Sequence, residues 1–162
     1  MSLSRRRFTA ALSCAPLLAL AGGRLNAAEP VAKSRLGGIA IGGHDAAAYH
    51  ALERAPRADA VAGQNRFEVE YKGATWRFAD AASAEAFRAE PQRYAPAYNG
   101  HCANALSLGE GLIRTDGTHW QIFDGDDTLY LFYAARGRER WLNGDRDAYR
   151  READAAWATL TR

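Results

Sequence analysis

FEVEYKGATWRF, residues 67–78, is the stretch of sequence that decides which fold class to expect. Apolar and polar residues alternate on both sides of Lys72-Gly73, and a period of two is typical of strands with one buried face. Glycine adopts a positive φ without steric cost, so Lys72-Gly73 suits a tight turn. The stretch therefore predicts an antiparallel β-hairpin.

A second hairpin is predicted farther along the chain. Residues 120–123 (WQIF) and 129–133 (LYLFY) are strand-like runs on either side of residues 124–127 (DGDD). This acidic segment lacks the length and spacing of a twelve-residue calcium loop. We therefore interpret it as a hairpin turn rather than a calcium site.

Short helices are expected around the hairpins. Asp45 is a candidate N-cap for a helix over residues 46–54 that ends at Pro56, and Asp80 opens an alanine-rich helix that ends at Pro91. Residues 143–145 (NGD) stop one helix and cap the next. One face of that last helix is apolar at helical spacing, and its members are Tyr149, Ala153, Ala156, Trp157 and Leu160.

The elements together predict an α+β fold. We expect a small antiparallel sheet of two hairpins with short helices packed on one face. Residues 39–41 (IAI) are a possible additional short strand. The chain has 162 residues, which suits one domain.

The first 28 residues are typical of a signal peptide. SRRRF at residues 4–8 precedes an apolar stretch that runs to about Ala21, which is too short to span a membrane. The arginine pair favours the twin-arginine type, and an ordinary secretory signal is the alternative. We expect cleavage after Ala28 rather than Ala21. A lipid anchor at Cys14 is disfavoured, because the apolar stretch continues past it.

Cleavage would leave residues 29–162 as a single domain, periplasmic or secreted and soluble. Four of the 21 basic side chains lie in the first 28 residues, so 17 remain against 19 acidic ones. This near-neutral charge predicts no basic surface for binding nucleic acid. The exported part has no second hydrophobic segment, so we expect no contact with a membrane.

Cys102 would then be the one thiol of the exported domain. It has no partner for an internal disulfide, and a single thiol in an oxidising compartment is buried, metal-bound, reactive or paired with another chain. We find no nucleophile elbow, phosphate loop or paired-carboxylate signature, so a binding module is favoured over an enzyme.

The sequence resembles the YHS domain family, and in particular its secreted single-domain bacterial branch. The resemblance covers nearly all of residues 29–162 and depends on the order and spacing of a set of short motifs. These are His44-Asp45 through Tyr49, residues 71–78 (YKGATWRF), Ala86-Phe87, Glu90-Pro91, Tyr94-Ala95-Pro96 and residues 98–103 (YNGHCA).

The resemblance implies a metal-binding module. In the secreted branch the position of Cys102 is sometimes selenocysteine, which implies soft-metal or redox chemistry there. This chain departs from the branch at two positions, because His44 and His101 stand where tyrosine is common.

Cys102, His101 and His44 are the predicted metal ligands. One cysteine with one or two histidines suits copper or zinc by ligand softness. His50, His119, Asp45 and the acids of residues 124–127 are further candidates. His101 and Cys102 are adjacent, so they would reach one ion only from an irregular loop, which Asn99-Gly100 could supply.

Three hypotheses remain open at this point. The first is an exported module that binds a soft metal ion or another thiophilic ligand at Cys102. The second is a thiol redox protein that uses Cys102 with an external thiol. The third is a partner-binding domain in which Cys102 is core packing.

Overall fold

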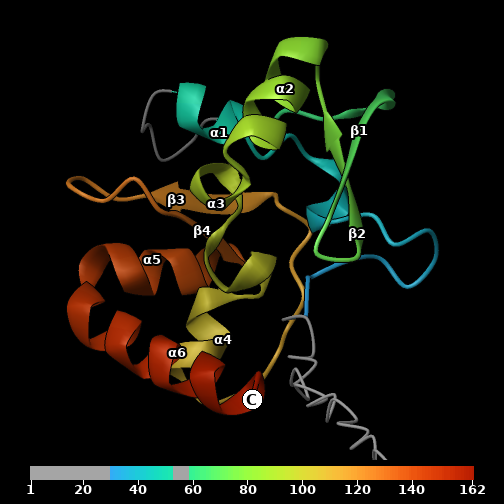
Figure 1. The fold of residues 1–162 in the computed structure, drawn as a ribbon. Coiled ribbons are helices and arrows are strands. Elements are labelled where there is room, and N and C mark those ends of the chain that lie inside the picture. The colour runs from blue at the N-terminus through green and yellow to red at the C-terminus, as the bar shows by residue number, and fades with distance from the viewer. Residues whose placement is uncertain (1–29, 53–58) are drawn as a thin grey trace, which may run out of the picture.

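The computed structural model describes residues 30–52 and 59–162, and it has an α+β fold (Figure 1). The α+β prediction is therefore confirmed. The predicted signal peptide (residues 1–28) and the end of the helix predicted over residues 46–54 lie outside the described residues. None of the described helices is long and apolar enough to cross a membrane.

The first predicted hairpin is formed by β1 (Gln64–Tyr71) and β2 (Ala74–Phe78). Tyr71 pairs with Ala74 across the turn, where Lys72 and Gly73 have φ values of 49° and 69°. These positive values are those of the tight hairpin turn that the sequence predicts.

The second hairpin, β3 (His119–Ile122) and β4 (Leu129–Phe132), lies between two layers of helices (Figure 1). It forms a separate two-stranded sheet and does not join β1–β2. Trp120, Ile122, Leu129 and Leu131 pack in one core cluster, whereas Tyr130 and Phe132 pack in a second. The β4 strand is apolar on both faces, so both faces of the hairpin are covered, and helices do not lie on one face only.

The helices divide between these two sides. The elements on the β1–β2 side are η1 (Ile41–Gly43), α1 (Ala48–Ala51), α2 (Ala81–Ala89) and α3 (Pro91–Tyr94). The remaining elements are η2 (Ala97–Gly100), α4 (Ala103–Ser107), α5 (Ala135–Asn143) and α6 (Arg146–Leu160).

Some of the local predictions are confirmed, and the structure differs from others. Asp80 and Asp145 cap α2 and α6 as expected, by accepting the backbone N–H of residues 83 and 148. Pro91 does more than end α2, because it is the first residue of α3. Residues 39–41 form only isolated bridges, since Ile41 turns to a φ of 42° and enters η1. Leu160 lies beyond the core and is 47% exposed.

Asp45 is fully buried and joins two parts of the chain. Its Oδ1 accepts the N–H groups of Ala47 (2.9 Å) and Ala48 (3.0 Å), and its Oδ2 accepts that of Ala79 at 2.9 Å. The carboxylate thus caps the turn that leads into α1 and also holds the end of β2. Three donors satisfy the buried acceptor, which would otherwise be costly.

We expect Asp45→Asn to lower the free energy of unfolding by about 3 kcal/mol. An amide presents one oxygen, so its NH₂ group would face a backbone N–H that the carboxylate now accepts. Urea denaturation followed by circular dichroism measures this. Asp80→Asn is the matched control, because asparagine caps a helix as well as aspartate does. Equal stability of the two variants would contradict the role given to Asp45.

Candidate functional site

The turn before Cys102 has an unusual backbone. Tyr98 and Asn99 are successive non-glycine residues with positive φ, 55° and 48°, followed by Gly100 at 86°. The Tyr98 hydroxyl donates to Asp154 at 2.9 Å, and the Asn99 carbonyl accepts from the N–H of Ala32 at 3.0 Å. Strain of this kind persists only where surrounding contacts hold it.

Glycine is needed at position 100 for two reasons, the positive φ and the lack of room for a Cβ atom. A Cβ at this position would lie 2.6 Å from Cγ2 of the buried Ile41. The left-handed turn therefore brings the chain tightly against η1. This is the irregular loop that the sequence analysis expects before His101 and Cys102.

Cys102 is 3% exposed and sits at the N-terminus of α4. Its Sγ accepts two backbone N–H groups, from Ala105 at 3.4 Å and from Tyr133 at 3.2 Å. The first donor belongs to the first turn of α4, and the second follows β4. Two elements distant in sequence thus direct donors at one sulfur atom.

A small pocket of about 60 Å³ opens beside this sulfur. Cys102 shares its walls with charged groups, Glu110 and Arg136, and with Ile113 and Tyr133. The thiol therefore faces a polar pocket and is not enclosed by apolar side chains alone.

His101 faces a different pocket from Cys102, although the two residues are adjacent. Its Nδ1 lies 3.0 Å from the Tyr98 carbonyl oxygen, and its ring packs against Trp157 at 5.8 Å between centroids. Since a carbonyl accepts, Nδ1 carries the proton. Burial lowers the pKa of His101 below 6.5, and the positive charge of Arg114 lowers it further, against a raising effect of the Tyr98 bond.

His44 belongs to another part of the fold. Its Nδ1 donates to the carbonyl of Asp116 at 2.8 Å, and the Tyr49 hydroxyl donates to the next carbonyl, that of Gly117, at 2.7 Å. A Cβ at Gly117 would lie 2.7 Å from the Tyr49 hydroxyl and 3.0 Å from His44 Nδ1. His44 therefore positions the loop before β3.

The other candidate ligands also have structural partners. The His50 ring packs edge-on against Tyr94, and His119 pairs with Phe132 in the β3–β4 ladder. Asp126 accepts from the N–H of Thr128 at 2.9 Å within the hairpin turn. Partial burial raises the pKa of Asp126, but hydrogen bonds from Thr128 and Tyr130 and the charge of Arg150 together outweigh this effect and hold the pKa below its usual range.

The residues do not fit a metal chelated by Cys102, His101 and His44. Within residues 30–52 and 59–162, no group of three or more His, Cys, Asp or Glu side chains is placed to hold a metal ion. Copper or zinc binding by this ligand set thus gains no support from the geometry, and it stays a prediction from the sequence.

Tyr133 and Arg136 also lie beside Cys102, and the sequence does not predict either of them. Tyr133 contributes its backbone N–H, and every residue type except proline has one, so no pattern of side chains could reveal it. Arg136 is one of several arginines in α5, and only the packing of α5 near α4 places it beside Cys102.

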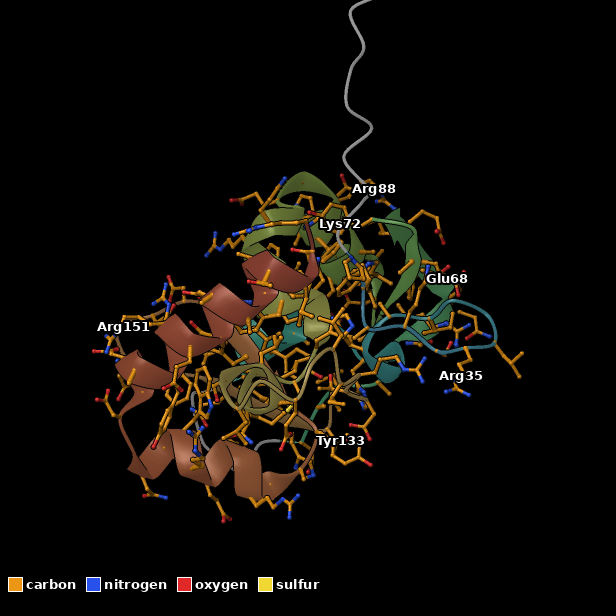
Figure 2. The ribbon with its side chains drawn as sticks, turned by 90° about the horizontal axis from the view of Figure 1, so that it is seen from below. Arg35, Glu68, Lys72, Arg88, Tyr133 and Arg151 are labelled. Atoms are coloured by element: carbon orange, nitrogen blue, oxygen red, sulfur yellow. The ribbon has the colours of Figure 1, made fainter. Side chains whose placement is uncertain are left out.

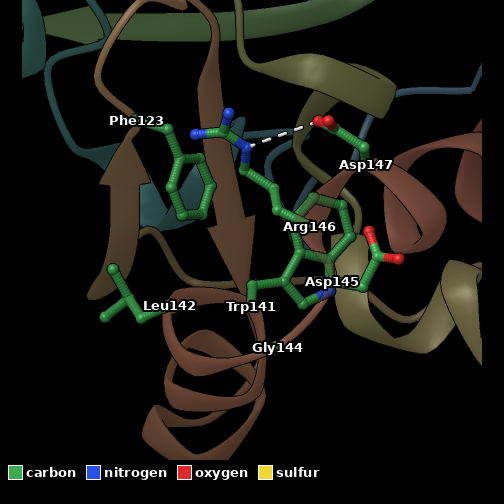
Figure 3. Close-up of a pocket in the computed structure, with 7 residues that line it drawn as sticks. All are labelled: Phe123, Trp141, Leu142, Gly144, Asp145, Arg146 and Asp147. Atoms are coloured by element: carbon green, nitrogen blue, oxygen red, sulfur yellow. Dashed lines mark ion pairs between the residues drawn. The ribbon is translucent and has the colours of Figure 1, made fainter.

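Another pocket, of about 360 Å³, lies at the α5–α6 junction, away from these residues (Figure 3). Arg146 extends over the Phe123 ring at 5.1 Å and pairs with Asp147 at 3.8 Å. The indole nitrogen of Trp141 is buried there and has no hydrogen-bond partner among the described residues. Neither cysteine nor histidine lines this pocket, so it offers nothing to the predicted chemistry.

Comparisons with known proteins leave the family open. No family model, no curated protein and no solved structure matches this chain. The resemblance to YHS domains therefore stays an interpretation of the sequence motifs.

His101 should make stability depend on pH. Its lowered pKa means that the unfolded chain, with an ordinary value near 6.5, takes up the proton first as the pH falls. The unfolded state then binds more protons, so the free energy of unfolding should decrease below pH about 6.5. His101→Gln should flatten this decrease, measured by urea denaturation at several pH values. An equally steep decrease in the variant would show that His101 is not its source.

Proposed function

We propose that this chain is an exported thiol protein whose Cys102 binds a thiophilic ligand through one sulfur bond. The observation that carries the proposal is the pair of backbone N–H groups directed at Cys102 Sγ. Thiolate is the form of cysteine that acts as nucleophile and metal ligand. The two N–H groups come from α4 and from the residue after β4, so they hold the sulfur in a fixed position beside the small pocket.

The pocket beside the sulfur supports a ligand rather than simple packing. A buried cysteine that acts only as a small hydrophobe needs neither donors nor charged neighbours. Cys102 has both, because Arg136 and Glu110 line the same small space. A volume of about 60 Å³ suits a single heavy atom or a small group rather than a large substrate.

The ligand takes one bond from this chain. Cys102 is the one free cysteine among the described residues, and no group of three metal-ligating side chains occurs within that part of the chain. A thiophile with one open position fits this site, and any further ligands come from another molecule. In the redox alternative, Cys102 likewise has no second cysteine among the described residues, so its partner is an external thiol.

Export is part of the proposal and is supported by the N-terminal residues. SRRRF at residues 4–8 and the apolar stretch after it have the pattern of a twin-arginine-type signal. Removal of the first 28 residues takes Cys14 away and leaves Cys102 as the thiol that reacts in the periplasm.

We expect native protein recovered from the periplasm without chelators to bind one methylmercury(II) cation per chain at Cys102, because this probe is small enough for the pocket. This probe accepts a single thiolate, so it matches a site with one sulfur ligand. Binding should be faster than global unfolding and should raise the melting temperature, because a ligand that binds only the folded state stabilises it. Mass spectrometry and thermal denaturation measure the two effects.

Cys102→Ser and Cys102→Ala are the controls, and both should fold and bind no probe. A wild-type thiol that reacts only as fast as the protein unfolds would make Cys102 core packing and overturn the proposal. Rapid oxidation of Cys102 by hydrogen peroxide, with no retained thiophile, would instead favour the redox alternative.

A further inference from the structure

The pocket that His101 faces is larger than the one at Cys102 and is lined by basic and apolar groups. Its volume is about 450 Å³. Figure 2 shows two of its side chains, Arg35 and Tyr133, on the surface seen from below. Its lining residues are Arg35, His101, Leu112, Ile113, Arg114 and Tyr133.

Two guanidinium groups give this pocket a positive charge. Arg35 and Arg114 are exposed, and neither has an ion pair or hydrogen-bonded side-chain partner among the described residues. No acidic residue lines the pocket. Arginine holds a carboxylate through two parallel N–H···O bonds, so this lining favours a carboxylate ligand.

His101 adds a largely buried imidazole to the same pocket. The residue is 4% exposed, and its Nδ1 is used by the Tyr98 carbonyl. Among the described residues the ring makes this one hydrogen bond, and Nε2 is not one of the fully buried polar atoms. In the neutral ring with a protonated Nδ1, Nε2 is an acceptor, so the ligand should offer an N–H or O–H donor.

The remaining wall is apolar. Tyr133 is 68% exposed and Ile113 is 37% exposed, and with Leu112 they present carbon surface beside the charged groups. Small-molecule sites commonly combine such a surface with a few converging polar groups.

We infer that this pocket binds an N-acylated amino acid group with a free carboxylate. The carboxylate pairs with Arg114 and Arg35, the adjacent amide N–H donates to His101 Nε2, and an apolar side chain covers Leu112, Ile113 and Tyr133. A small acyl amino acid and the C-terminal residue of a peptide share this chemistry.

This site is independent of the thiol chemistry proposed for Cys102. The two pockets share Ile113 and Tyr133 as walls, but Cys102 does not line the larger one. Binding should therefore survive Cys102→Ser, which abolishes the thiol function. Failure of one proposal leaves the other intact.

The test is a titration of isotope-labelled protein with N-acetyl-L-leucine, followed by nuclear magnetic resonance. Saturable shifts should occur in residues 112–114 and at Tyr133. Arg114→Gln should weaken binding about tenfold, because it removes a charge-assisted pair. Arg151→Gln should bind like the wild type, because Arg151 is exposed on α6 and lines neither this pocket nor the one at Cys102.

Changes in the probe test each contact without altering the fold. N-acetyl-L-leucinamide lacks the charge and should not bind, and 4-methylpentanoate lacks the amide and should bind about fivefold more weakly. A peptide ending in leucine that binds more tightly than N-acetyl-L-leucine would identify a peptide C-terminus as the source. No saturable binding of N-acetyl-L-leucine, or equal affinity for its amide or in Arg114→Gln, would overturn the inference.

Discussion

The buried Asp45 carboxylate is the constraint on which the first half of this domain depends. Its two oxygens accept three backbone N–H groups, two at the start of α1 and one just after β2. Burial without these donors would be costly, so the carboxylate and its partners form together. This fixes the β1–β2 hairpin against the chain that carries His44 and Tyr49, and these two side chains in turn hold the loop before β3.

Cys102 plays a comparable part in the second half, with sulfur in place of a carboxylate. Its two donors come from α4 and from the residue after β4. The β3–β4 hairpin makes this possible because it is buried on both faces and stands between the two core clusters. The position of Tyr133 N–H therefore depends on packing from both sides, and the chemistry at the sulfur depends on the same packing.

The strained turn at Tyr98–Gly100 explains why two adjacent residues serve different purposes. His101 and Cys102 leave the turn with an extended backbone, so their side chains point to opposite sides. One pocket receives the thiol with Arg136 and Glu110, and the other receives the imidazole with Arg35 and Arg114. The sequence predicts one site that uses both side chains, whereas the structure has two neighbouring pockets that share Ile113 and Tyr133 as walls.

Sequence alone determined both hairpins, the caps at Asp80 and Asp145, the α+β class and Cys102 as the residue of interest. These features depend on local periodicity, turn chemistry and composition, which neighbouring residues carry. Only the tertiary structure decided that the hairpins form separate sheets and that His44, His101 and Cys102 lie in three different settings. The tertiary structure also identified Tyr133 as the second donor to Cys102 Sγ. The sequence could not predict this donor, because every residue except proline has a backbone N–H.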